Sequence, residues 1–229
     1  MSNTDSFIDE VTEEVRRDRL FALMRRYGWI AVLAILLLVG GATWNEWRKA
    51  QERSAAQALG DAMLAALAVE DRDARAEALS AIDAQNPQAD AVIELLAAAE
   101  ASANSPDAAA ERLLALADRS DVDAVYRNIA TLKAVMLPGS GLEIEVRRTR
   151  LNGLALGGGV LRLLAEEQLA LLDLESGDRA NAAQRLTAIA ADAEATTGLR
   201  RRVTQVIVAI GEDLPDLPEP LQDAVTAGE

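Results

Sequence analysis

The 229-residue chain contains no cysteine and no histidine. The lack of cysteine excludes disulfides, thiol nucleophiles, thiolate metal sites and a lipoprotein attachment cysteine. The lack of histidine removes the commonest metal ligand and the side chain that titrates near neutral pH. Ser-His-Asp and Cys-His catalysis are therefore excluded, and an enzyme would have to use carboxylates, lysine or tyrosine. No such residues form a recognisable cluster, so we expect no enzyme activity, no metal and no cofactor.

Aromatic residues and positive charge are also scarce. Only 3% of the residues are aromatic, whereas half are hydrophobic and mostly alanine or leucine. This composition favours an all-α fold. The net charge of −14 opposes binding to nucleic acid, which needs clustered Lys and Arg. We therefore expect protein partners rather than nucleic acid or a small-molecule substrate.

Residues 27–45 near the N-terminus carry no charge. We predict that a transmembrane helix spans this run and ends at Trp47, so that it covers residues 27–47. Its 21 residues make a helix of about 31 Å, which matches a hydrocarbon core of about 30 Å. Aromatic side chains, which favour membrane interfaces, stand at both ends: Tyr27 and Trp29 at one, Trp44 and Trp47 at the other.

Two alternatives to a transmembrane helix are a buried core helix and a cleaved signal peptide. A core helix would seldom begin and end with tryptophan and flanking arginine. A signal peptide usually has 7–15 apolar residues after a short basic region, whereas 26 residues precede this longer run. No small-residue cleavage site follows it, because Ala42 is succeeded by Thr43 and Trp44.

The distribution of basic residues predicts the orientation of this span. Five arginines precede it and three basic residues follow it closely: Arg16, Arg17, Arg19, Arg25 and Arg26 before, and Arg48, Lys49 and Arg53 after. The more basic side of a span usually stays in the cytoplasm. We therefore expect a single-pass protein of a bacterial inner membrane, with a cytoplasmic N-terminus and a periplasmic C-terminal domain.

Residues 1–26 are expected to form a cytoplasmic amphipathic segment. Ser6 is the predicted helix cap, with Asp9 three residues later. Apolar residues then recur at helical spacing: Ile8, Val11, Val15, Leu20, Leu23 and Met24. Such a helix either lies on the membrane surface or docks on a membrane partner.

Residues 48–211 are predicted to form a domain of short helices. The helix of the span continues without a breaker to about residue 69. Further helices are expected at about 73–84, 87–103, 106–119, 121–137, 142–156, 160–176, 179–194 and 198–211. Asn86-Pro87, Ser105-Pro106 and Asp121 supply start signals. Residues 212–229, with six acids, no base and three of the six prolines, are expected to be an acidic tail.

Residues 165–189 carry the clearest sign of a repeat, which resembles a tetratricopeptide repeat. Small Ala170 allows two helices to approach closely, Gly177 and Asp178 make the turn, and Ala182 and Leu186 pack back on the first helix. A weaker echo occurs at Ala97, Ala109, Leu113 and Leu116. The bulky aromatics and the closing proline of such repeats are missing, which indicates a degenerate repeat domain.

Other motifs have simpler interpretations than a site. Gly157–Gly159 lacks the strand and the Gly-Lys-Ser/Thr of a phosphate loop, so a turn between helices is expected. The acidic pairs Glu143/Glu145 and Glu166/Glu167 are expected on solvated helix faces. The arginine runs 147–150 and 200–202 are expected to be helix-surface charge whose stems cover apolar neighbours. The Gly40-Gly41 pair could allow a second membrane helix to approach.

The whole layout resembles the YfgM-like family of ancillary subunits of the SecYEG translocon, in an alphaproteobacterial style. The shared features are a charged N-terminal helix, one span ending in Trp-x-x-Trp, an uninterrupted helix beyond it, and a degenerate Ala/Leu-rich repeat domain. The resemblance implies a non-enzymatic adaptor near the Sec translocon, with periplasmic chaperones or exported clients as partners. An envelope scaffold for outer-membrane assembly or cell division is the alternative.

Overall fold

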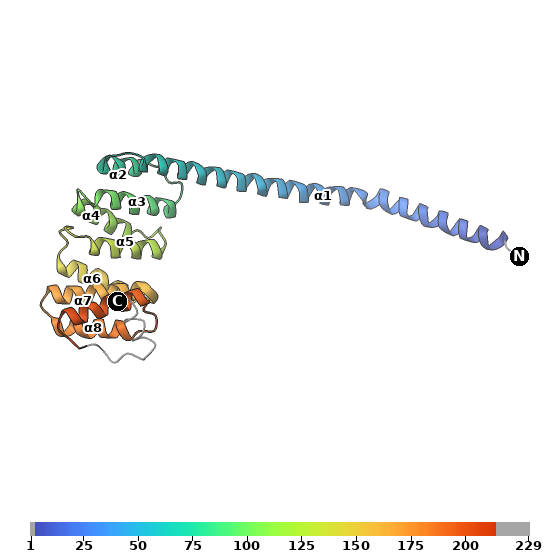
Figure 1. Cartoon of the computed structure of the whole chain (residues 1–229). Helices are drawn as coiled ribbons and strands as arrows, with labels where there is room; N and C mark the ends of the chain where they lie inside the picture. Colours follow the sequence, from blue (N-terminus) through green and yellow to red (C-terminus); the bar gives the residue numbers. More distant parts are fainter. Residues whose placement is uncertain (1–2, 214–229) are drawn as a thin grey trace. The chain divides into compact units, whose positions relative to one another are not determined.

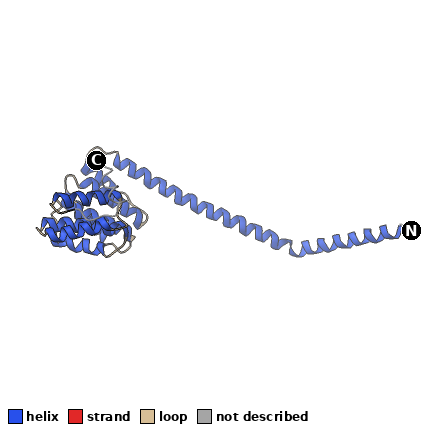
Figure 2. Ribbon diagram, turned by 60° about the horizontal axis from the view of Figure 1, so that its bottom comes forward, coloured by secondary structure: helices blue, strands red, loops and turns tan. Residues whose placement is uncertain are grey.

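The computed structural model describes the backbone of residues 3–213 and the side chains of residues 24–30 and 33–213. Every regular element in this part of the chain is an α-helix (Figures 1 and 2), which confirms the all-α prediction. The chain divides into two compact units, Met1–Gly60 and Asp61–Glu229. Most of the acidic tail expected at 212–229 lies outside the described residues.

The first unit is formed by helix α1 (Asn3–Leu67), whose last turns belong to the second unit. Helix α1 is long and apolar enough to cross a membrane over its Met24–Leu67 part, and none of the described residues in its apolar window is buried. The helix already includes Asn3, so Ser6 lies inside it and does not cap it, contrary to the prediction. The side chains of the expected amphipathic segment before Met24 lie outside the described residues.

The second unit contains the remaining helices of the described chain. They are α2 (Arg72–Ser80), α3 (Pro87–Ala101), α4 (Pro106–Ala117), α5 (Ala124–Met136), α6 (Ile144–Ala155), α7 (Gly159–Glu175), α8 (Arg179–Ala191) and α9 (Thr197–Ala209). Each coincides with a helix expected from the sequence, although α2 ends at Ser80 and not near residue 84.

The helix starts show which capping predictions were right. The Asn86 carboxamide oxygen accepts a hydrogen bond from the backbone N–H of Ala89 at 2.8 Å, as an N-cap should. One other assignment was wrong. Asp123, not Asp121, precedes α5, and the Asp121 carboxylate is instead bound by Arg119 (Nη2 to Oδ2, 2.8 Å).

The helices of the second unit pack as a two-layer stack (Figure 1). Each helix from α2 onward contacts the next one along the chain, and in addition α3 contacts α5 and α5 contacts α7. The odd-numbered helices α3, α5 and α7 therefore lie side by side in one layer. Stacked helix pairs of this kind are typical of solenoid repeats.

The core is continuous through this stack because two helices each contribute to two apolar clusters. Helix α5 supplies Ala130 and Ala134 to a cluster with α3 and α4, and Leu132 and Val135 to a cluster with α6 and α7. Helix α7 in turn shares a third cluster with α8 and α9. Burial of these alanines and leucines, at roughly 25 cal/mol per Å², holds neighbouring pairs together.

Candidate functional site

The turn between α7 and α8 is built by the residues that suggested a repeat. Gly177 has a φ of +83°, which glycine adopts at little cost. Its N–H donates to the Leu174 carbonyl at 3.0 Å, and the N–H of Asp178 donates to the Asp173 carbonyl at 2.8 Å. This pair of backbone hydrogen bonds is a Schellman motif, which closes α7. The Asp178 carboxylate then accepts from the N–H of Asn181 at 3.2 Å and caps α8.

The remaining repeat residues lie between the two helices that this turn connects. Ala170, Ala182 and Leu186 are fully buried. Ala170 and Leu186 belong to the apolar cluster shared by α7, α8 and α9. The structure therefore brings all five proposed repeat-packing residues together around one helix pair.

Arginine–carboxylate pairs connect the helices around α7. Asp173, whose side chain is only 6% exposed, binds Arg148 of α6 (Nη1–Oδ1, 2.5 Å) and Arg185 of α8 (Nε–Oδ2, 3.0 Å). Arg185 also binds Glu166 of α7. One carboxylate thus connects three successive helices, and charge-assisted hydrogen bonds of this kind are the stronger ones.

Four arginines of the two runs therefore differ from the helix-surface charge that the sequence predicted, whereas Arg201 is exposed as expected. Arg147, Arg148 and Arg150 each pair with a carboxylate on another element: Glu175, Asp173 and Asp118. Arg200 is buried, and its guanidinium donates to the carbonyls of Ala190 and Asp192, both at 2.9 Å. It thereby satisfies carbonyls at the C-terminus of α8, where a cation is favourable.

Two of the carboxyls that pair with arginine, those of Asp118 and Asp192, have a lowered pKa. Hydrogen bonds from Arg150 lower the pKa of Asp118. Hydrogen bonds from Arg162, and then from the backbone N–H of Glu194, lower the pKa of Asp192. Both carboxyls are therefore held in the ionised form at neutral pH.

The candidate binding surface is an apolar groove of about 940 Å³ across α5, α7 and α9. Its lining is dominated by leucine, methionine, valine and isoleucine side chains. The groove residues are Leu132 and Met136 of α5; Leu164, Glu167, Gln168, Leu171 and Leu174 of α7; Leu186 of α8; and Arg202, Gln205, Val206, Ala209 and Ile210 of α9. Met136 is 49% exposed and Leu171 is 39% exposed, so the groove presents apolar surface to solvent.

A single ion pair forms the polar part of the groove wall. Glu167 of α7, a buried residue, accepts two hydrogen bonds from the Arg202 guanidinium of α9, at 2.9 and 2.8 Å. Because Arg202 donates these hydrogen bonds to the Glu167 carboxylate, its own pKa is raised. The sequence predicted Glu167 on a solvated helix face, but the residue is buried, and its ion pair holds α9 against α7.

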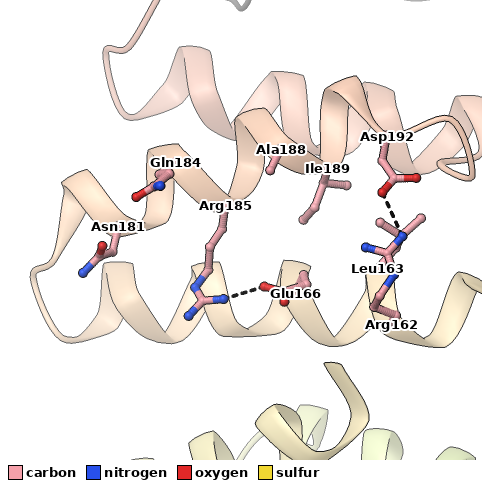
Figure 3. Close-up of a pocket in the computed structure, with 9 residues that line it drawn as sticks. All are labelled: Arg162, Leu163, Glu166, Asn181, Gln184, Arg185, Ala188, Ile189 and Asp192. Atoms are coloured by element: carbon pink, nitrogen blue, oxygen red, sulfur yellow. Dashed lines mark hydrogen bonds and ion pairs between the residues drawn. The ribbon is translucent and has the colours of Figure 1, made fainter. Parts of the chain in front are cut away.

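A second cavity, of about 370 Å³, lies between α7 and α8 (Figure 3). Arg185 faces Glu166 across one part of it, and Arg162 reaches Asp192 at 2.8 Å at the other end. Its charged side chains thus bind one another, which leaves them poorly suited to hold a ligand. Among the residues that the structure describes, no group of three or more acids could hold a metal ion.

The four predicted interface aromatics are exposed on α1. Tyr27 lies under the guanidinium of Arg26, with 5.8 Å from the Arg26 Cζ to the ring centroid. The Trp44 and Trp47 rings pack on each other, with centroids 5.3 Å apart. Trp29 is also exposed.

Sequence reasoning missed the groove, although one signal could have found it. Leucines at 164, 171 and 174 form a second apolar stripe on α7, in addition to the buried Leu163 and Leu169. A helix that packs on one face alone needs only one stripe. The excess of leucine on α7 therefore indicated a second apolar surface.

The comparisons with known proteins agree with this architecture. A family model described as a tetratricopeptide repeat-like domain matches residues 25–138, just under half of the chain. The match covers the apolar helix and the weaker repeat echo but ends before the Ala170–Leu186 repeat. No curated protein and no solved structure matches the chain significantly. The chain therefore contains a tetratricopeptide repeat-like helical domain, a kind of module that typically binds proteins.

Proposed function

We propose that this chain is a membrane-anchored adaptor, without enzyme activity, that binds segments of other proteins in the groove across α5, α7 and α9. The observation that carries the proposal is the exposed apolar surface of this groove, to which Met136 and Leu171 contribute. An exposed apolar surface that is also concave is typical of a binding site and is uncommon elsewhere on the surface of a monomer.

The lining favours a peptide segment over other ligands. Leucine and methionine side chains adapt to apolar partners, and the amides of Gln168 and Gln205 offer hydrogen bonds to a peptide backbone. Helix-in-groove and extended-segment recognition both use such surfaces. The groove carries no cluster of free cations for nucleic acid and no acidic cluster for a metal among the described residues.

We further propose that residues 27–47 cross the inner membrane of a bacterium, with residues 1–26 in the cytoplasm and the domain of residues 48–211 in the periplasm. The exposed aromatics at both ends of the span support its limits. The excess of arginine before Tyr27 supports the orientation. The resemblance of the layout to translocon subunits supports Sec translocon components, periplasmic chaperones or exported clients as partners.

The groove is tested by site-specific photocrosslinking of the full chain in native membranes. A photoreactive residue at position 171 should capture a partner, and one at Leu156 should not. Leu156 is the matched control because it is 90% exposed and lies outside the groove. Leu171→Asp should lower partner capture from the neighbouring position 136 roughly tenfold, as for loss of a central interface residue, while Leu156→Asp should not.

Equal capture from positions 171 and 156 would contradict the groove as the binding site. The identity of the captured protein decides between the two partner classes. Capture of a translocon subunit, a chaperone or an exported client supports the adaptor proposal. Capture only of outer-membrane assembly or division proteins favours an envelope scaffold instead.

A further inference from the structure

The groove reaches the end of α9, and the chain leaves α9 at that point. Ala209 and Ile210, at the end of the helix, line the groove. Gly211, with a φ of +81°, donates from its N–H to the Val208 carbonyl at 3.0 Å, and the N–H of Glu212 donates to the Ile207 carbonyl at 3.1 Å. This Schellman motif ends α9, so the residues that follow start beside the groove.

The sequence of these following residues has the features of a ligand for an apolar groove. Residues 214–229 read LPDLPEPLQDAVTAGE. Leu214, Leu217, Leu221 and Val225 supply apolar side chains at regular intervals along the segment. Three prolines restrict the backbone before binding, which lowers the entropy lost when such a segment is held in a groove.

The length and charge of this segment also fit. Helices packed side by side are about 8–10 Å apart, so the groove from α9 to α5 extends about 20 Å. Sixteen residues can extend to about 50 Å. The segment carries four acids and no base, and the one carboxylate that lines the groove, Glu167, is already paired with Arg202, whose side chain stays half exposed. No unpaired carboxylate in the lining thus repels the segment.

From these observations we infer that residues 214–229 occupy the groove of their own chain and compete there with partner segments. The inference rests on the groove being a binding site, as proposed above. A segment attached next to its site has an effective concentration in the millimolar range, so it excludes weak partners and yields to strong ones. The segment thereby sets a threshold affinity for partners.

Because the natural chain has no cysteine, disulfide trapping can test this inference in the full chain. The double variant Leu171→Cys with Leu217→Cys is oxidised mildly in detergent, digested with trypsin and analysed by mass spectrometry. A disulfide between positions 171 and 217 would join the tryptic peptides 163–179 and 203–229. The control pairs Leu156→Cys with Leu217→Cys and would join peptides 151–162 and 203–229. Position 156 is fully accessible and tethered to position 217 by a chain of similar length.

The linked fraction should be at least about tenfold higher for the 171 pair than for the 156 pair, because a bound segment has a far higher local concentration than a tethered free one. Equal linkage overturns the inference. A disulfide between two chains, seen as a dimer on a non-reducing gel, also overturns it, because the segment then occupies the groove of a second copy.

A second measurement separates this inference from the proposed function. Partner capture from a photoreactive residue at position 171 is compared between the full chain and a chain that ends at Asp213. Competition predicts several-fold higher capture after the segment is removed. Partner capture that is unchanged on removal, together with equal linkage, overturns the inference and leaves the adaptor function intact. Strong linkage with no partner captured by either chain supports the inference and overturns the adaptor function.

Discussion

At the scale of single residues, Asp173 has the most unusual environment in the repeat domain. It is a charged residue with only 4% of its surface exposed, and it is bound by Arg148 from one flanking helix and Arg185 from the other. Taking a carboxylate out of water costs several kcal/mol unless such partners compensate it. The arrangement therefore depends on all three residues being present.

Replacement of Asp173 with alanine should lower the free energy of unfolding by about 3 kcal/mol, because it leaves two guanidinium groups in a partly buried site without their shared partner. The measurement is urea unfolding of the full chain in detergent, followed by circular dichroism at 222 nm. Glu175→Ala is the matched control, because the Glu175 carboxylate pairs with Arg147 but is half exposed. Its loss should cost less than about 1 kcal/mol. Equal effects of the two substitutions would show that Asp173 does not connect the helices.

At the scale of the elements, the turns determine where each helix ends. Gly177 closes α7 with a positive φ and has open space around its Cα. Gly153 lies inside α6 with ordinary helical geometry and also has open space. Replacement of glycine by alanine should therefore change the stability of the domain in opposite directions at these two positions.

Gly177→Ala should destabilise the domain by about 1 kcal/mol, because an alanine is strained in the left-handed conformation. Gly153→Ala should stabilise it by about 0.5–1 kcal/mol, because alanine loses less backbone entropy within a helix. Thermal unfolding of the two full-length variants, followed by circular dichroism, measures both effects. A stabilising Gly177→Ala would contradict the turn described here.

The helices could be predicted from the sequence, but several of their contacts could not. Asn86-Pro87 is a local signal, and it marks the start of α3 correctly. Asp121 was the predicted start signal for α5, but in the folded chain Asp123 precedes the helix and Asp121 pairs with Arg119. The pairing of Glu167 with Arg202 joins residues 35 positions apart. The spacing of residues within a single helix does not predict such a contact. The leucines on α7 indicated a second apolar surface, but the helices that complete the groove could not be predicted, since its walls come from helices that are separated in the sequence.

At the scale of the whole molecule, the proposed orientation in the membrane is open to a direct test. Single cysteines can be placed without interference because the chain has none. Leu156→Cys in the repeat domain should react with a membrane-impermeant maleimide in intact cells whose outer membrane has been permeabilised. Asn3→Cys should react only after the inner membrane is disrupted, because the more arginine-rich side of the span stays in the cytoplasm. The reverse labelling pattern would show the opposite orientation.

The arginine pairs between the helices have one more consequence, which concerns protons. Arginine stays charged at any pH a cell meets, and the pKa values of Asp118 and Asp192 lie below their ordinary range. The chain has no histidine or cysteine, and only two tyrosines. From about pH 6 to pH 9 the carboxyls of Asp118 and Asp192 thus keep their negative charge. Their bonds to Arg150 and Arg162 are therefore insensitive to mild changes in the acidity of the surroundings.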